Sequence, residues 1–352
     1  MFLQSLELIQ FRNILRGEME FSPRFNVISG PNGSGKSNIL EALYLFFNGK
    51  SFRKARGRDM ISWEKEWFRL LLQEKSLSHP RFLYYDQEKN YKYGIEQKEV
   101  AYSEFFLQIC PFLLSREVFN LFYFSSGEIR RFFDMYLLIF DSGYRERILR
   151  FNRVLQERNA LLKSRFFSVR ELEIWDEYFV RYASEVSDAR RRFIGEIDAN
   201  LPQAFQKLFP SVDDAGIDYR SSFNEKDFFR AREEDRARGF TTVGPHRDRF
   251  LFRTKGKEMS AQASQGQMKS FVLSLFLTLL TLFNDRFSVK GILLLDDIFE
   301  ELDPSRKKRI LDEIIRSGCQ VFFTMVQGKQ PFGEEGRIFQ IKEGIISDAA
   351  AL

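Results

Sequence analysis

The feature that most constrains the fold is a glycine-rich loop at residues 30–37, which reads GPNGSGKS. It matches the pattern G-x-x-x-x-G-K-[ST], and it lies between a short apolar run, FNVIS, and an apolar segment that begins at Asn38. A strand, a glycine-rich loop and a helix in this order direct backbone N–H groups and a helix N-terminus at phosphate groups. The sequence therefore predicts an α/β domain that binds a nucleoside triphosphate, taken to be ATP.

The side chains of this motif have predicted roles. Lys36 is expected to reach the β- and γ-phosphates, and the Ser37 hydroxyl is expected to ligate Mg²⁺. A second oxygen ligand for Mg²⁺ commonly comes from an aspartate at the end of a buried strand. The run GILLLDD supplies Asp296 for this purpose, directly or through water. Asp297 is then placed to orient or deprotonate the attacking water, and Glu300 is a weaker candidate for that base.

The two halves of this predicted site are far apart in the chain. Lys36 and Asp296 are 260 residues apart, whereas a compact P-loop kinase or G-protein closes its site over a much shorter stretch. Strand and helix signals alternate near both ends of the chain, which describes an α/β domain interrupted by an insertion. The expected fold class is thus a split P-loop ATPase head, residues 1–118 and 241–352, interrupted by a helical arm domain, residues 119–240.

Within the predicted arm, apolar residues recur at helical spacing on both sides of a break near Ser168. This pattern predicts two long amphipathic helices, packed antiparallel. The arm holds equal numbers of basic and acidic residues, as expected for solvated helices with many ion pairs. The charged stretch from Asn224 to Gly239 is expected to be mobile.

A third element lies about 30 residues before the aspartates, in the run ASQGQMKSF. Ser264 is a predicted N-cap, and Gly266 leaves the backbone open at the start of a long helix. Such a helix end binds a γ-phosphate well. Because the site already has its own P-loop, we expect this helix end to bind a phosphate held by another subunit. The alternative for the run taken alone is an ordinary capped core helix.

Composition sets further limits on the function. Hydrophobic residues make up 44% of the 352 residues and charged residues 29%, which is typical of a soluble globular protein. The longest apolar runs fall short of a membrane span and the N-terminus does not resemble a secretory signal, so a cytoplasmic protein without a membrane partner is expected. Two cysteines and two histidines cannot form a Cys/His metal cluster. The net charge of +5 permits nucleic-acid binding, and the cluster from Lys50 to Arg58 is either a solvated loop or a contact with a phosphate backbone.

The motifs, taken in order, resemble those of the bacterial RecF family, recombination-repair ATPases related to SMC heads and ABC ATPases. The resemblance covers nearly the whole chain. It is carried by FRN at 11–13, GPNGSGKSNILEAL at 30–43, IRRFFD at 129–134, QERNALL at 156–162, GPHRD at 244–248, SQGQMK at 264–269, LLLDDIFEELD at 293–303 and QVFFT at 320–324. The sequence departs from the family pattern at Arg249, at 115–118, at Tyr123-Phe124 and after QVFFT; these departures leave the ATP core unaltered but put finer DNA and partner contacts in question.

This resemblance implies two ATPase heads that close face to face around two ATP molecules. Ser264 and Gly266 would then contact the γ-phosphate bound to the partner, and Asp303 would lie in a loop across the dimer seam. His246 would lie near this interface, either as a structural or as a catalytic histidine. The residues expected to bind nucleotide are Arg12, Asn13, Gly30, Pro31, Asn32, Gly33, Ser34, Gly35, Lys36, Ser37, Asn38, Ser264, Gly266 and Gln267.

The function implied by the resemblance is an ATP-gated switch that binds DNA. ATP would drive dimerisation on single-stranded, double-stranded or gapped DNA, and slow DNA-stimulated hydrolysis would reopen the dimer. RecR and RecO would be partners in loading RecA. The alternatives are an SMC- or ABC-like head that serves another DNA-processing or transport machine, and a metabolic phosphotransferase, for which no acceptor pocket is visible in the sequence.

Overall fold

The computed structural model describes residues 2–88, 90–105, 111–164, 168–210, 214–259, 264–288, 290–298, 304–326 and 336–349. The chain divides into two compact units. The P-loop unit is formed by residues 1–119 and 280–352, and the arm unit by residues 120–279. Compactness alone does not define a functional domain, so the head and arm bounds expected from the sequence stay a prediction.

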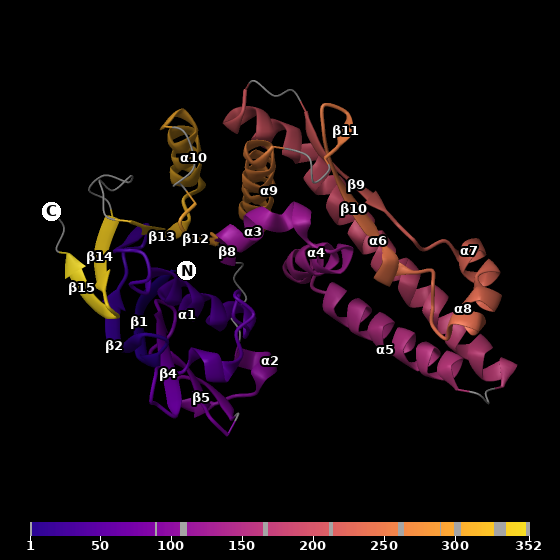
Figure 1. The fold of residues 1–352 in the computed structure, drawn as a ribbon, viewed down its shortest axis with the longest axis horizontal. Coiled ribbons are helices and arrows are strands. Elements are labelled where there is room, and N and C mark those ends of the chain that lie inside the picture. Colours follow the sequence, from indigo (N-terminus) through magenta and orange to yellow (C-terminus); the bar gives the residue numbers. More distant parts are fainter. Residues whose placement is uncertain are drawn as a thin grey trace. The chain divides into compact units, whose positions relative to one another are not determined.

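A mainly parallel sheet forms the centre of the P-loop unit, in the order β15-β14-β3-β13-β12-β8 (Figure 1). Strands β14, β3, β13, β12 and β8 run parallel, and β15 is antiparallel to β14. The residues of β3, β8 and β12 are all buried, as short apolar strands covered on both faces should be. The bounds are β3 Phe25–Ser29, β8 Pro111–Leu114, β12 Ile292–Leu295, β13 Gln320–Met325, β14 Gly336–Lys342 and β15 Ile345–Ala349.

An antiparallel sheet forms the second layer of this unit, in the order β2-β1-β4-β5-β6-β7. Its last four strands pair in chain order and form a meander. The bounds are β1 Leu3–Phe11, β2 Ile14–Glu20, β4 Trp67–Glu74, β5 Arg81–Asp86, β6 Tyr91–Ile95 and β7 Lys98–Glu99.

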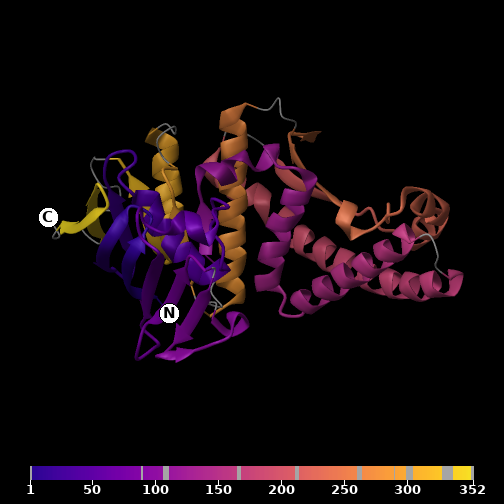
Figure 2. The ribbon, with the colours of Figure 1, turned by 60° about the horizontal axis from the view of Figure 1, so that its bottom comes forward.

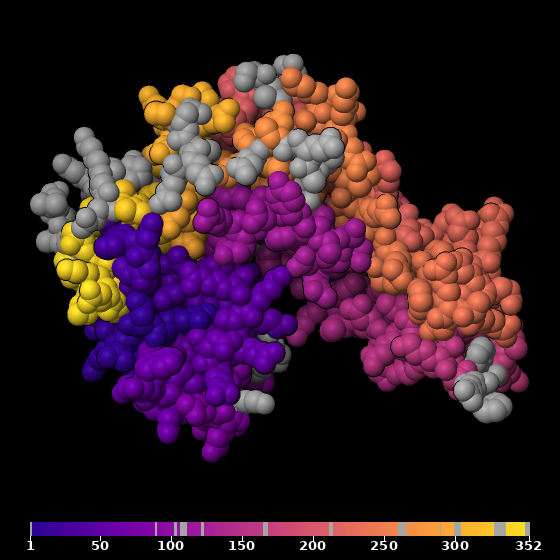
Figure 3. Space-filling view, in the orientation of Figure 1, coloured from indigo at the N-terminus to yellow at the C-terminus, as the bar shows by residue number. Residues whose placement is uncertain are grey.

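Helix α1, Lys36–Asn48, contacts strands of both sheets and carries much of the core between them. Its Ile39, Leu43 and Phe46 are fully buried in one cluster with Leu6 and Leu70 of the antiparallel sheet. The other helical elements of the unit are η1 Gly57–Met60, α2 Tyr102–Phe105, α3 Arg116–Phe119 and α10 Pro304–Ser317. The last strands of the chain lie beside its first segment, since β14 pairs with β3 and β15 contacts β2 (Figure 3).

The arm unit is built on two long helices, α5 and α6, that lie side by side in both ribbon views (Figures 1 and 2). Arg158 pairs with Asp176 while Arg150 lies over the ring of Tyr182, so the two helices run antiparallel as predicted. Ser168 caps α6, which explains the predicted break. The bounds are η2 Asn120–Tyr123, α4 Ser126–Phe140, α5 Tyr144–Lys163, α6 Val169–Leu208, α7 Glu225–Arg230, α8 Arg232–Arg238 and η3 Pro245–Arg247.

Two parts of the arm unit differ from the sequence expectation. Residues Ala215–Arg220 form strand β9, which joins β10, Arg249–Thr254, and β11, Lys257–Glu258, in an antiparallel sheet. The stretch from Asn224 to Gly239, expected to be mobile, forms α7 and α8. Phe228 and Asp235 on these helices are fully buried, and that burial anchors the stretch.

Helix α9, Gln265–Arg286, begins in the arm unit and ends in the P-loop unit. By length and composition it is apolar enough to cross a membrane, with a mean hydropathy of 1.5 over Gly266–Arg286. However, 67% of that window is buried inside the protein, as is typical of the core helix of a soluble protein. The hydroxyls of Ser270, Ser274 and Thr278 each donate a hydrogen bond to the backbone carbonyl four residues earlier, which satisfies them within this apolar helix.

A buried ionic cluster holds the long helices of the arm unit to α8. Arg158, fully buried, donates to Asp176 at 2.7 Å and to Asp235 at 2.8 Å. Its guanidinium lies 4.7 Å from the ring centroid of Phe228. Arg232 supplies a second cation to Asp176 at 2.6 Å. One arginine of α5 thus connects α6, α7 and α8.

We predict that Arg158→Leu lowers the free energy of unfolding by about 3–5 kcal/mol, because the buried Asp235 loses its cation. The matched control is Arg181→Leu, which removes an exposed ion pair to Glu185 and should cost less than about 1 kcal/mol. Urea unfolding of the two variants measures both values. Equal stabilities for the two variants would contradict the assigned importance of the buried cluster.

Candidate nucleotide site

The glycine-rich loop follows β3 directly and leads into α1. Gly35 adopts a φ of 116°, and a Cβ there would lie 2.6 Å from the side-chain oxygen of Asn13. At Gly30 a Cβ would lie 2.2 Å from the carbonyl oxygen of Ile341. Both positions therefore require glycine, for conformation at one and for close approach at the other. The loop and the start of α1 have the strand–loop–helix context that the motif requires.

Two polar groups of the loop are poised for a phosphate. Lys36 is 4% exposed, and its ammonium donates to the carbonyl oxygens of Gly30 at 2.9 Å and Pro31 at 3.1 Å. The buried hydroxyl oxygen of Ser34 has no hydrogen-bond partner within the described ranges. An unpaired buried hydroxyl is costly, so this atom fits a site where an incoming anion completes the hydrogen bonding.

The two halves of the predicted site come together at the carboxyl ends of the parallel strands. The Ser37 hydroxyl donates a hydrogen bond of 2.7 Å to the Asp296 carboxylate, across 259 residues of chain. The cause is the sheet register: Ser29 of β3 pairs with Met325 of β13, and Leu295 of β12 pairs with Phe323. The residues that follow β3 and β12 therefore meet at one edge, where open α/β sheets bind ligands.

Thr324 links the two aspartates, and the sequence analysis did not predict it as a site residue. Its hydroxyl oxygen lies 2.9 Å from Asp296 Oδ1 and 3.1 Å from Asp297 Oδ1. It also accepts a hydrogen bond of 2.9 Å from the backbone N–H of Asp297. The threonine at the end of QVFFT was the available signal, because β13 lies between β3 and β12 in the sheet.

The surroundings perturb the pKa of Asp296 and the backbone conformation of Asp297. Burial raises the pKa of Asp296, and its neighbour Asp297 acts in the same direction, while hydrogen bonds from Ser37 and Thr324 oppose it. Asp297 has a φ of 49°, in the left-handed region that is unfavourable for most residues. Strained backbone of this kind persists where surrounding contacts enforce it, and it is concentrated at functional sites.

A polar network braces the loop from the side of β1. Arg12 makes two hydrogen bonds, of 2.7 and 2.9 Å, to the fully buried carboxylate of Glu41 on α1. Asn13 donates to the carbonyl of Ser34 at 2.8 Å and accepts from Asn38 at 2.8 Å. The structure thus places Arg12, Asn13 and Asn38 beside the loop, and it adds Glu41, which sequence reasoning missed.

Arg53, a member of the basic cluster Lys50–Arg58, also faces this network. Its guanidinium donates to the side chain of Asn38 at 2.8 Å and lies 3.8 Å from the Glu41 carboxylate. One of the cations considered for a DNA backbone contact therefore lies against the P-loop helix.

The predicted signature residues lie in the arm unit, at the start of α9. Ser264 and Gln267 form a reciprocal cap: the Ser264 hydroxyl accepts from the Gln267 N–H at 3.3 Å, and the Gln267 side chain accepts from the Ser264 N–H at 3.0 Å. Ser264, Gly266 and Gln267 are exposed. Their contact with a partner's nucleotide stays a prediction. Glu300 and Asp303 lie outside the described residues.

His246 uses one ring nitrogen for a hydrogen bond, and the other, Nδ1, is buried without a hydrogen-bond partner among the described residues. Its Nε2 lies 2.9 Å from the carbonyl oxygen of Thr241, which requires a proton on Nε2. Burial lowers the pKa of His246 to about 4, so the ring is neutral at physiological pH. The ring packs near Phe151 and Phe179 inside the arm unit.

Three comparisons with known proteins bear on the chain as a whole. Residues 25–324 match the family described as "AAA domain, putative AbiEii toxin, Type IV TA system". Over 360 residues, the chain is 31% identical to the DNA replication and repair protein RecF of Lachnoclostridium phytofermentans, covering 98% of this chain and 99% of that protein.

The chain belongs to the RecF family.

The sequence resemblance is thereby confirmed, and the chain is a RecF-like P-loop ATPase of DNA replication and repair. Its fold matches a solved structure entitled "Structure of the recombination mediator protein RecF-ATP in RecFOR pathway", with a TM-score of 0.88, 25% identity and coverage of 99% of this chain and 98% of that one. It also matches an Smc head domain from Pyrococcus furiosus, with a TM-score of 0.61, 17% identity and coverage of 99% and 96%. The latter likeness concerns the fold alone, and it confirms the predicted fold class of an SMC-like ATPase head with a helical region.

We predict that Thr324→Val slows ATP hydrolysis about tenfold, because losing one buried hydrogen-bonding hydroxyl leaves its partners unpaired, at about 1–3 kcal/mol. The Kd for ATP should change less than the rate, because the Thr324 hydroxyl contacts the aspartates and none of residues 30–37. Single-turnover hydrolysis and an ATP-binding titration separate the two effects. Thr324→Ser keeps the hydroxyl and should restore the rate; a slow Thr324→Ser variant would contradict this role.

We predict that His246→Gln alters the pH dependence of stability. The native pKa of about 4 lies below the ordinary value of 6.5, so unfolding takes up a proton between these values. The histidine's contribution to the free energy of unfolding is fully present above pH 6.5 and is lost as the pH falls toward 4. The stability advantage of wild type over the variant should therefore shrink by about 2–3 kcal/mol between about pH 7 and pH 4.5. Urea unfolding at both pH values measures it, and parallel pH profiles would contradict a neutral buried ring.

Proposed function

We propose that this protein is an ATP-gated DNA-binding switch of recombinational repair and replication. ATP would bind at the P-loop of one subunit, and the exposed start of α9 on a second copy would contact its γ-phosphate. Closure of the two copies would create the DNA-binding state, and slow DNA-stimulated hydrolysis would end it. The observation that carries the proposal is the Ser37–Asp296 hydrogen bond, which assembles a nucleotide site from the two ends of the chain.

The residues near the loop fit this chemistry. Lys36 would exchange its loop carbonyl partners for the β- and γ-phosphates. Asp297 would orient or deprotonate the attacking water, held in place by Thr324. Arg12 and Asn13 would keep the loop in the shape that the phosphates need.

The donor set at Ser37 and Asp296 fits Mg²⁺, because a hydroxyl and a carboxylate oxygen lie 2.7 Å apart at the mouth of the loop. Mg²⁺ is usually bound through one or two carboxylates and substrate phosphates. Within the described ranges no group of three or more His, Cys, Asp or Glu side chains could hold a metal. We propose that Ser37 and Asp296 hold Mg²⁺ together with the nucleotide, and that the ion neutralises charge on the phosphates when bound.

ATP can gate a dimer because ATP binding and closure of the two copies are thermodynamically linked. ATP shifts the equilibrium toward the closed state only if it binds that state more tightly than the open one. A phosphate shared between one copy's P-loop and another copy's Ser264 and Gly266 would supply that difference. The solved RecF structures are named for the RecFOR pathway, and we propose that this chain acts in the same pathway. Its ligand would be single-stranded, double-stranded or gapped DNA. RecR and RecO would be its partners, and the loading of RecA would be the outcome.

We predict that Ser264→Arg retains ATP binding but loses ATP-dependent dimerisation and hydrolysis, because the added side chain blocks the proposed phosphate contact. The matched control is Ser168→Arg. Like Ser264, Ser168 is exposed and caps a helix; its partner in the reciprocal cap is Glu171. Both variants therefore lose a cap worth about 1 kcal/mol and gain one positive charge. ATP titration, light scattering with and without duplex DNA, and phosphate release measure the three properties.

A third variant, Lys36→Ala, should weaken ATP binding by about 10–100-fold, because it loses a charged hydrogen bond. A Ser264→Arg variant that dimerises and hydrolyses ATP like Ser168→Arg would contradict the shared site.

A further inference from the structure

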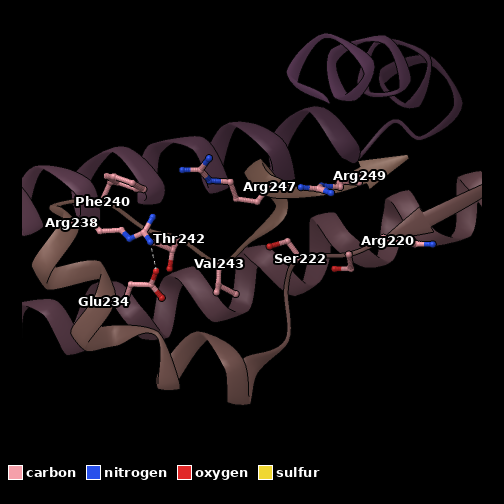
Figure 4. Close-up of a pocket in the computed structure, with 10 residues that line it drawn as sticks. Arg220, Ser222, Glu234, Arg238, Phe240, Thr242, Val243, Arg247 and Arg249 are labelled. Atoms are coloured by element: carbon pink, nitrogen blue, oxygen red, sulfur yellow. Dashed lines mark ion pairs between the residues drawn. The ribbon is translucent and has the colours of Figure 1, made fainter. Parts of the chain in front are cut away.

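A basic pocket opens on the arm unit, well separated in sequence from the P-loop. It has a volume of about 560 Å³ and is lined by residues of β9, α8, η3 and the start of β10. Four exposed arginines, Arg220, Arg238, Arg247 and Arg249, line it. Figure 4 shows Arg238 and Phe240 at one end of the pocket, Arg220 at the other, and Arg247 and Arg249 between them.

The positive charge in this pocket is only partly compensated. Arg238 pairs with Glu234 at 2.8 Å. For Arg220, Arg247 and Arg249, no carboxylate partner is found in the described part of the chain. The pocket therefore carries about three unneutralised positive charges in a confined space.

Two of these arginines occupy directly opposite positions of a strand pair. Arg249 of β10 pairs directly with Arg220 of β9 in the antiparallel ladder, so both side chains stand on the same face of the sheet. Like charges directly opposite each other destabilise a strand pair. An anion between them would remove this repulsion, which makes the pair a feature of an anion site.

A buried network holds these arginines in place. Asp248, fully buried between Arg247 and Arg249 in the sequence, accepts from Arg190 at 2.8 Å and from the backbone N–H of Ser222 at 2.7 Å. The Tyr219 hydroxyl also donates to this carboxylate. Because Asp248 points inward, its two neighbours are exposed on the outer side, and the bond to Ser222 ties the end of β9 to the same loop. The backbone that carries Arg247 and Arg249 is thus fixed.

The pocket is larger than a phosphate group alone requires, and its volume is in the range of small-molecule sites. Phe240 contributes an aromatic face, over which the Arg247 guanidinium lies 5.4 Å from the ring centroid. Guanidinium groups bind phosphate bidentately, and an aromatic ring stacks on a base. This combination matches a nucleotide unit better than a bare phosphate.

We propose that the arm pocket is a second phosphate site, which binds a nucleotide unit through Arg220, Arg247 and Arg249, with Phe240 beside its base. The unit is supplied either by a DNA strand or by a free nucleotide. The DNA case rests on the proposed DNA-binding function, whereas the free-nucleotide case does not.

The test compares Arg247→Glu/Arg249→Glu with the matched control Arg145→Glu/Arg170→Glu. The control makes the same change in charge at two exposed arginines of the arm unit, outside the pocket. Binding of a fluorescently labelled single-stranded oligonucleotide is measured across a salt series, and binding of AMP by calorimetry. AMP lacks the β- and γ-phosphates that Lys36 is expected to hold, so it reports on the pocket.

For a DNA strand, the pocket variant should bind at least about tenfold more weakly than the control, and its slope of log K against log salt should be smaller by about two. For a free nucleotide, AMP binding should be lost in the pocket variant and retained in the control. Arg220→Gln/Arg249→Gln removes charge without reversing it, and it should show the same losses in smaller degree if the protein remains folded. Phe240→Leu should weaken AMP binding more than binding of inorganic phosphate.

Pocket variants that match the control in both assays overturn the proposal. Wild-type protein that binds no DNA, with or without ATP, contradicts the proposed function instead, and the AMP measurement then decides on the pocket by itself.

Discussion

The hydrogen bond between Ser37 and Asp296 depends on one constraint, the register of three neighbouring parallel strands. β13 lies between β3 and β12, and it fixes the heights at which their carboxyl ends stand. A shift of one residue in either pairing would turn side chains to the opposite face and separate the two oxygens. Thr324 belongs to the intervening strand and contacts both aspartates, so the strand that sets the register also orients the acidic groups.

The rest of the P-loop unit keeps this register and the loop above it in place. α1 packs Ile39, Leu43 and Phe46 into the core between the sheets, which fixes the helix whose N-terminus carries Lys36 and Ser37. Glu41 on the same helix is the buried acceptor for Arg12. The apolar core and the polar network therefore both position the N-terminal end of α1.

Much of this could be predicted from the sequence, for physical reasons that differ between residues. The P-loop and the aspartates after β12 follow buried apolar strands, and parallel topology brings such strand ends together without further information. Thr324 also lies near the end of a buried parallel strand, but its contacts with both aspartates depend on a strand order that the sequence does not state. Glu41 could not be assigned in this way, because its importance arises from a contact with Arg12. Glu41 lies within a helix whose pattern predicts only core packing.

The arm unit shows the same division. The spacing of apolar residues was enough to predict α5 and α6, because both helices are amphipathic. The charged stretch that forms α7 and α8 has few apolar residues, and it is held instead by Asp235 and Phe228 against Arg158. A buried ion pair leaves no periodic signal in a sequence, since its members look like ordinary surface charges until their partners are known.

The split organisation of the P-loop unit also has a consequence for synthesis on the ribosome. Strand β3 and the phosphate loop are made before the arm unit, whereas β12 and β13 are made after it. Until β13 and β14 are made, β3 lacks both of its neighbours in the sheet, and its unpaired backbone edges favour misassociation. The arm unit is one continuous segment and can pack before the sheet is complete. A product that ends before β12 would therefore carry a complete arm unit and a P-loop that lacks Asp296.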